Sequence, residues 1–188
     1  MLKPVFAFLL LATSPIAATA QNTSLGQWKL ANASDGCMVH ATSRKGTVLS
    51  ISAMPGEDSL LFVVQSRQLS SLRDGERYGI EVEFDDMGEW QIAALAQTSL
   101  DSDGPGLIFA VRPGREDGAN FLKEFASASG MQIGHDGAAL DTLPLSGGTG
   151  AMSALATCLS QKWPARSGAQ GQGGPLIEVA DGEEAVPL

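Results

Sequence analysis

The chain has 188 residues, with 12 Lys and Arg against 21 Asp and Glu, 22 glycines and two cysteines, and 44% of its residues are hydrophobic. This length and cysteine count exclude a multidomain enzyme and a disulfide-dense mini-protein, and they favour one modest globular domain. The formal net charge of -9 argues against nucleic acid or an anionic membrane surface as the main partner, because binding to phosphate groups needs a basic face.

Residues 1–20 have the three parts of a secretory signal peptide. Lys3 lies near the start, an apolar run extends from Val5 to Ala12, and Ala18-Thr19-Ala20 matches a small-x-small cleavage site. The apolar run is shorter than the about 20 residues that a transmembrane helix needs. We therefore expect a cleaved export signal, a mature chain that begins at Gln21 without a membrane anchor, and a periplasmic location.

The first half of the chain is predicted to be antiparallel β structure. Short extended runs cover Trp28 to Leu30, Cys37 to Thr42, Thr47 to Ala53, Leu60 to Val64, Tyr78 to Phe84, Trp90 to Ala96 and Gly106 to Val111. The run from Leu60 is apolar on both faces, which is typical of a central strand. In the run from Tyr78, Ile80, Val82 and Phe84 alternate with acidic residues, which predicts one buried face and one wet face.

A first helix is predicted in the second half of the chain. Phe121, Leu122, Phe125 and Ala128 lie at helical spacing and would form its buried face. Asp117 is expected to cap the start of this helix, because a short carboxylate can accept hydrogen bonds from free backbone N–H groups there. Gly130 is expected to end it.

The rest of the second half predicts a hairpin and another helix. Residues 131–133 and 138–143 form extended runs that turn at Asp136-Gly137. A second helix follows Ser146 and covers residues 150–161. The predicted fold is α+β: an antiparallel sheet or sandwich of about seven to nine strands with two helices in the second half.

The composition divides the chain into a single globular domain over residues 21–163 and a flexible Gly/Pro/acidic tail over residues 164–188. Residues 165–175 consist largely of Gly, Ala, Gln, Ser and Arg, which bury too little apolar surface to offset the entropy of ordering. Residues 176–179 could add a strand to a sheet edge, but an unstructured linker is the preferred interpretation.

Cys37 and Cys158 are the two cysteines of the chain. An oxidising compartment allows them to pair, and two cysteines have a single intramolecular connectivity. We expect this disulfide to be structural, because a redox-active pair normally has Cys-x-x-Cys spacing.

No catalytic residue, metal ligand or cofactor is predicted. The two histidines, His40 and His135, have no second metal ligand at a recognisable spacing, and zinc sites need three or four converging donors. A Ser-His-Asp arrangement would have to use one of these histidines, and no Gly-x-Ser-x-Gly elbow accompanies them. Residues 101–104 resemble the start of a calcium loop, but the position of its bidentate acid is occupied by Arg112.

The segment over residues 74–89 is strongly acidic, with seven acids against one base. Its residues Glu81, Glu83, Asp85, Asp86 and Glu89 form the predicted partner-binding patch. Such a patch can serve solubility alone, or it can steer a basic partner. The carboxylate pair of a glycoside hydrolase is a third interpretation, but that chemistry needs one shielded acid, and an open strand face shields none.

Several of these features occur in an order that resembles a known group of proteins. The order is Phe84-Asp85 after an alternating strand, then Trp90, a Phe121-Leu122 helix, Met131-x-Ile133, and Leu143-Pro144-Leu145-Ser146-Gly147 leading into Ala151, Leu155 and Cys158. Over residues 28–160 the chain resembles small exported proteobacterial proteins of the invasion-associated locus B kind and the VasI-type accessory proteins of type VI secretion. The resemblance implies a secreted β-rich domain with two helices and no known catalytic residues.

The sequence therefore predicts a non-enzymatic periplasmic protein that acts by protein–protein contact, as an envelope or secretion accessory factor. Its expected partner is another envelope or secreted protein. The alternative is an acidic inhibitor of a basic exported hydrolase, such as a lysozyme or a protease. An enzyme is the third hypothesis, and it would require His40 or His135 to meet a carboxylate and a Ser or Thr inside a pocket.

Overall fold

The structure is a computed structural model of the chain, and it describes residues 25–32, 36–85, 87–100, 104–135 and 138–163. The predicted signal peptide, the predicted tail of residues 164–188 and the predicted turn at Asp136-Gly137 lie outside the described residues.

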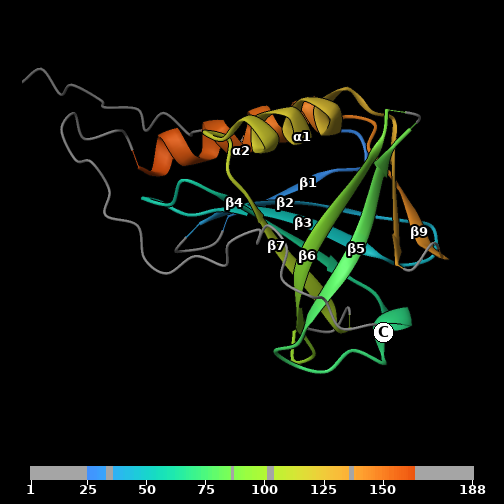
Figure 1. Cartoon of the computed structure of the whole chain (residues 1–188). Coiled ribbons are helices and arrows are strands. Elements are labelled where there is room, and N and C mark those ends of the chain that lie inside the picture. The colour runs from blue at the N-terminus through green and yellow to red at the C-terminus, as the bar shows by residue number, and fades with distance from the viewer. Residues whose placement is uncertain (1–24, 33–35, 86, 101–103, 136–137, 164–188) are drawn as a thin grey trace, which may run out of the picture.

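The described residues form nine strands, one short 3-10 helix and two α-helices (Figure 1). In chain order these are β1 (Lys29–Asn32), β2 (Cys37–Thr42), β3 (Val48–Ala53), β4 (Leu60–Gln65), η1 (Arg67–Leu69), β5 (Arg77–Phe84), β6 (Glu89–Gln97), β7 (Gly106–Val111), α1 (Glu116–Ser127), β8 (Gly130–His135), β9 (Ala138–Pro144) and α2 (Gly148–Lys162). Both α-helices lie in the second half, so the predicted α+β class is confirmed.

All nine strands belong to one sheet with the order β1-β2-β3-β4-β7-β6-β5-β8-β9, and every neighbouring pair is antiparallel. Most neighbours are consecutive in the chain. The exceptions are the pairings of β4 with β7 and of β5 with β8, which join three locally paired groups of strands. The strand β4 is internal, as its apolar composition predicts.

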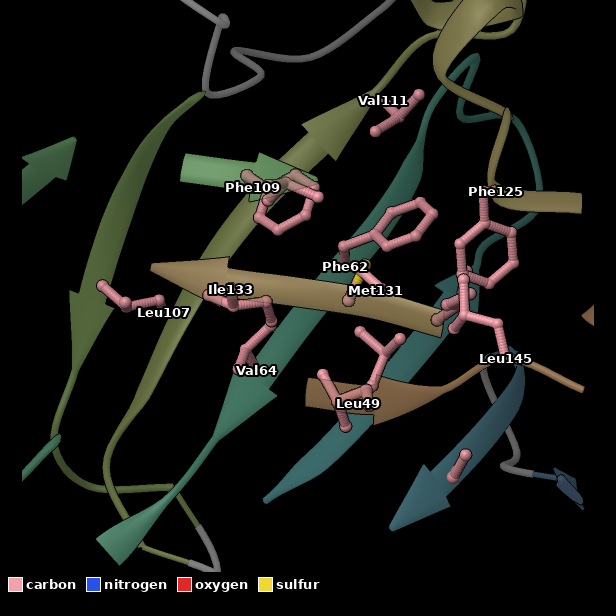
Figure 2. Packing of buried hydrophobic residues seen from close by; sticks show 14 of the residues in the cluster. Leu49, Phe62, Val64, Leu107, Phe109, Val111, Phe125, Met131, Ile133 and Leu145 are labelled. Carbon is pink, nitrogen blue, oxygen red and sulfur yellow. The ribbon is translucent and has the colours of Figure 1, made fainter. Parts of the chain in front are cut away.

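The hydrophobic core lies between one face of the sheet and the two helices. From β5, Tyr78, Ile80, Val82 and Phe84 are buried, as the alternation in the sequence predicts. The helices α1 and α2 lie together over one end of the curled sheet (Figure 1). Figure 2 shows Phe62, Phe109 and Phe125 converging in this core. The Phe62 ring centroid lies 5.2 Å from that of Phe109 and 5.7 Å from that of Phe125.

The ends of α1 differ from the prediction. Arg115 is the N-cap residue, without a side-chain capping bond, and Asp117 lies inside the first turn, where its Oδ1 accepts a hydrogen bond from the Gly118 N–H. The negative charge of Asp117 therefore interacts favourably with the positive end of the helix dipole, and Asp117 is not the cap residue. The helix ends at Ser127, and Gly130 is the first residue of β8, so the prediction that Gly130 ends the helix is wrong.

The start of α2 depends on a glycine. The N-cap residue, Gly147, has a φ of 91°, in the left-handed region that side chains with a Cβ rarely adopt. Ser146 precedes this cap, and α2 has no side-chain capping bond. Thr149 lies within the first turn and donates its hydroxyl to the carbonyl oxygen of Ala126 at 2.8 Å, so its side chain joins α2 to α1.

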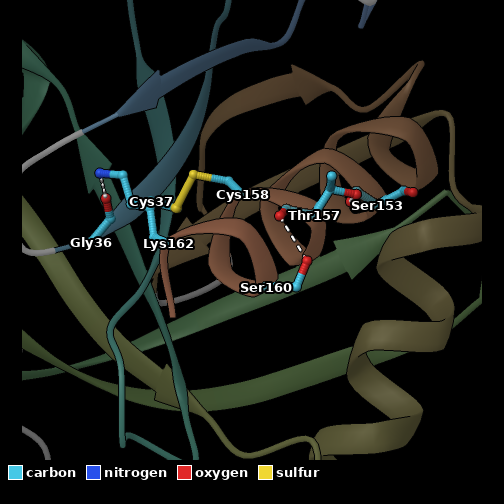
Figure 3. The surroundings of a disulfide bond; sticks show 7 residues. All are labelled: Gly36, Cys37, Ser153, Thr157, Cys158, Ser160 and Lys162. Atoms are coloured by element: carbon cyan, nitrogen blue, oxygen red, sulfur yellow. Dashed lines mark hydrogen bonds between the residues drawn. A yellow bond between two sulfur atoms is a disulfide. The ribbon is translucent and has the colours of Figure 1, made fainter. Parts of the chain in front are cut away.

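The predicted disulfide is present and ties the last helix to an early strand (Figure 3). Cys37 begins β2 and Cys158 lies in α2; their Cα atoms are 6.1 Å apart, and the two residues are 121 positions apart in sequence. A second contact supports the same junction, because the Lys162 ammonium group donates to the carbonyl oxygen of Gly36 at 3.2 Å. The disulfide and this hydrogen bond together hold α2 against β2.

The two edge regions of the curled sheet approach each other. Asp141 in β9 is buried, and its Oδ2 accepts a hydrogen bond of 2.7 Å from the hydroxyl of Ser43, which follows β2. The ammonium group of Lys45 lies 3.8 Å from Oδ1 of the same carboxylate. The side-chain amide of Gln27, which precedes β1, donates to the carbonyl oxygen of Pro144. These contacts fix the curvature of the sheet.

The Asp141 carboxylate should make the stability of the protein depend on pH. Burial alone raises its pKa, but hydrogen bonds from Ser43, Thr47 and Thr142 and the charge of Lys45 outweigh burial, so the pKa is lowered. Because the folded pKa lies below the unfolded value of about 4, this stabilisation is complete above the unfolded value. It is lost as the pH falls through the folded pKa.

We expect Asp141→Asn to lower the free energy of unfolding near neutral pH by about 1 to 3 kcal/mol, because an amide cannot accept all the hydrogen bonds of the carboxylate. The loss should shrink at acidic pH. Urea unfolding at a series of pH values measures both effects. An equal loss at every pH would contradict the assignment of a charged Asp141, and Glu57→Gln at an exposed position is the control.

Candidate functional site

An opening interrupts the middle of the sheet, between β6 and β7. These two strands pair at only three positions, Leu95↔Ile108, Ala96↔Leu107 and Gln97↔Gly106. Continuing this register would place Ala94 opposite Phe109, but the strands diverge before that point. On their far sides β6 pairs with β5 and β7 pairs with β4. Within the described sheet, residues 90–94 of β6 and 109–111 of β7 therefore have a strand neighbour on one side only.

The start of α1 lies over this opening because the connection from β7 is short. The strand β7 ends at Val111 and α1 begins at Glu116, with a turn in which the Arg115 N–H donates to the carbonyl oxygen of Arg112 at 3.1 Å. Gly118 packs against this turn so closely that a Cβ at its position would lie 2.0 Å from the Arg112 carbonyl oxygen. A glycine is therefore needed for the first turn of α1 to reach the end of β7.

A pocket of about 210 Å³ occupies the opening. Its apolar lining comes from Trp90, Ile92, Phe109, Ala110, Val111 and Phe121, and its polar lining from Gln91, Arg112, Arg115 and Asp117. The Trp90 side chain is held from two sides, because its indole N–H donates to Glu124 Oε2 at 2.6 Å and its ring meets that of Phe121 edge to face at 5.5 Å. The pocket therefore has a pre-formed aromatic wall, which suits a large apolar group.

Charged side chains stand around the mouth of the pocket. The Arg112 Nε lies 3.8 Å from Asp58 Oδ1, and the Arg115 Nε lies 3.7 Å from Asp117 Oδ1. Both guanidinium groups thus already have a carboxylate beside them. On the β6 side, Glu89 is exposed and its Oε1 accepts a hydrogen bond from the side chain of Gln91.

The structure brings three residues of the predicted acidic patch together. Glu81 and Glu83 lie on the outer face of β5, and Glu83 stands directly opposite Glu89 in the β5–β6 register. Two like charges in such a cross-strand pair repel each other. Glu81 stands opposite Gln91, which lines the pocket. We define Glu81, Glu83 and Glu89 as the acidic face; it lies on the sheet surface next to the opening.

Asp85 belongs to a different contact. Its φ is 46°, and its carboxylate accepts hydrogen bonds from the Ser129 N–H at 2.8 Å, the Gly130 N–H at 2.9 Å and the Ser129 hydroxyl. The backbone hydrogen bond from Ser129 is the main reason that the pKa of Asp85 is lowered. Asp85 therefore joins the end of β5 to the link between α1 and β8. Its neighbour in the predicted patch, Asp86, lies outside the described residues.

The two histidines lie away from this pocket. His40 in β2 stands opposite Ser50 of β3. Neither histidine is in the pocket lining. His135, at the end of β8, is buried, and its Nδ1 contacts the carbonyl oxygen of Gly79. Among the described residues, no three His, Cys, Asp or Glu side chains gather as a potential metal site. Residues 101–103 of the suggested calcium loop are outside the described residues.

Sequence reasoning did not predict the pocket, although one of its residues carries a signal. A glycine within a helix costs about 1 kcal/mol relative to alanine, so Gly118 beside an apolar helical face indicates a close contact with another part of the chain. The divergence of β6 and β7 has no such signal, because residues 90–96 and 106–111 both have ordinary strand composition.

Comparisons of the chain with protein-family models, with curated proteins and with solved structures gave no match in any of the three. The resemblance of residues 28–160 to the locus B and VasI-type proteins therefore stays a prediction. In the described ranges, neither α-helix has both the length and the apolar composition needed to span a membrane.

Proposed function

We propose that the protein is a non-enzymatic exported protein that acts by contact with another envelope or secreted protein. The observation that carries the proposal is the opening between β6 and β7, which combines unpaired strand edges, an aromatic pocket and an adjoining acidic face. Unpaired strand edges and apolar pockets are features through which proteins bind other polypeptides. The signal-like sequence of residues 1–20 and the Cys37–Cys158 disulfide are compatible with work in an oxidising compartment.

The test is chemical crosslinking of the tagged full-length chain in the envelope of the cell that produces it. Lys29, Lys45 and Lys123 supply exposed or partly exposed amines for the crosslinker. We expect one partner protein to be captured reproducibly and to be absent when an unrelated exported protein carries the tag. A repeated lack of any specific adduct would count against a function by contact.

An acidic inhibitor is the second candidate, and the acidic face favours it. Glu83 and Glu89 face each other across two strands although like charges there reduce stability. This cost suggests a role for the charge beyond solubility. A basic lysozyme or protease as the captured partner, with inhibition that weakens as salt rises, would favour this candidate over an accessory factor.

A further inference from the structure

Backbone groups on both sides of the opening lack a strand neighbour. An antiparallel strand directs the N–H and C=O groups of alternate residues to opposite sides. On the side of the opening, residues 90–94 of β6 and 109–111 of β7 meet no strand in the described part of the chain. Such edges are templates for an added strand, because an extended peptide supplies the matching donors and acceptors.

The pocket beside these edges is suited to a side chain of that peptide. Side chains of an extended segment alternate between the two sides of a sheet, so one of them can point into the core side of the opening. There the walls are Trp90, Phe109 and Phe121, and Phe121 is almost fully buried. The pocket of about 210 Å³ suits one large aliphatic or aromatic side chain.

The charges near the mouth of the pocket determine which charge is favoured on the peptide residues that flank the bound apolar side chain. Arg112 and Arg115 each stand beside a carboxylate, Asp58 and Asp117 respectively. Glu83 on β5 and Glu89 on β6 add two carboxylates next to the opening, and neither takes part in an ion pair among the described residues. The charges at the mouth balance, so the acidic face beside it supplies the excess of negative charge that complements lysine or arginine.

We propose that the opening between β6 and β7 binds an extended segment of a partner protein as an added strand. One large apolar side chain of the segment occupies the pocket, and a basic residue beside it faces Glu83 and Glu89. This inference rests on the proposed function and deepens it, because it names the surface and the kind of partner. The partner binds through its backbone and two side chains, so its recognition motif is short.

The test begins with a library of random linear peptides displayed on phage and selected on the full-length chain. We expect the selected peptides to share a large apolar residue with a Lys or Arg near it and to lack proline in between. A synthetic copy of the best peptide is then used in fluorescence anisotropy. Selection of no peptide above background, or of peptides without this pattern, would overturn the proposal.

Methylation of the peptide backbone distinguishes strand addition from the docking of a side chain alone. N-methyl groups placed one residue at a time should weaken binding about fivefold at every second position and have little effect at the positions between. This alternation arises because a segment added along the β6 edge, beside Glu89, directs only its alternate N–H groups to that strand. A flat response would show that no strand is added, and it would overturn the proposal.

Two matched pairs of variants locate the peptide on the protein. Gln91→Trp fills the mouth of the pocket and should weaken binding at least about tenfold, whereas Gln161→Trp, at an exposed position of α2, should not. Glu89→Lys should also weaken binding, with a loss that shrinks at high salt. Its control is Glu57→Lys on an exposed turn. If each test variant bound the peptide as tightly as its control, the peptide would bind elsewhere, and the assignment of the opening as its site would be refuted.

The outcomes separate this inference from the proposed function. A partner captured from the envelope whose binding is unaffected by Gln91→Trp would leave function by contact intact and overturn the role of the opening. Failure of the capture would count against the proposed function whatever the peptides show. If Ile177→Asp in the full chain raised the affinity for the selected peptide, residues 176–179 of the chain itself would be the occupant, and the proposal would fail.

Discussion

Replacing both Cys37 and Cys158 with alanine should lower the free energy of unfolding by about 2 to 5 kcal/mol. The disulfide joins positions 121 apart, so its loss frees a long loop in the unfolded chain. The folded state also loses the covalent link between β2 and α2. Urea unfolding of the parent and the double variant, without reductant, measures the difference.

Reduction provides the control for this experiment. A reductant should shift the unfolding midpoint of the parent towards that of the double variant and leave the double variant unchanged. Equal midpoints for parent and variant without reductant would show that the disulfide does not stabilise the fold. A shift of the double variant by reductant would mean that the reagent acts through something other than this bond.

Phe121→Ala should lower the free energy of unfolding by about 3 to 5 kcal/mol, because it removes a buried aromatic ring and leaves a cavity. The Phe121 ring meets four others edge to face, those of Phe62, Phe84, Trp90 and Phe109, at centroid distances from 5.0 to 6.1 Å. Chemical unfolding followed by circular dichroism measures the loss.

Two further variants separate packing from helix formation. Phe121→Leu keeps most of the buried volume and should cost less than Phe121→Ala. Leu122→Ala, on a partly buried position of the same helix, should also cost less, since less apolar surface is lost there. A loss for Leu122→Ala as large as that for Phe121→Ala would contradict a special role for the aromatic cluster.

The strands of the fold are largely predictable from the sequence. The runs Cys37–Thr42 and Gly106–Val111 have the predicted bounds in the structure, and β5 differs from its prediction by one residue at its start. The β2 and β5 strands each have one buried face and therefore repeat their apolar residues with a period of two, whereas β7 is buried throughout and is predicted by its unbroken apolar composition. The ends of helices are less predictable, as Asp117 and Gly130 show.

The opening and the final form of the acidic patch depend on contacts between distant parts of the chain. Within the patch, the Glu83–Glu89 pair is local, since these residues are six positions apart and meet through the β5–β6 register. Asp85, only two residues from Glu83, instead binds the backbone at Ser129 and Gly130. Ser129 lies 44 positions from Asp85 in the chain, and no local sequence pattern identifies it as a partner.

The strand order also bears on how the chain folds. The neighbours β1–β2–β3–β4, β5–β6–β7 and β8–β9 follow each other in sequence, so each group can form by local zipping. The β4–β7 and β5–β8 pairings close much longer loops. In the chain, α1 lies between β7 and β8. Closure of such loops costs entropy before any contact is gained. The two long-range pairings, rather than the turns, should therefore set the folding rate.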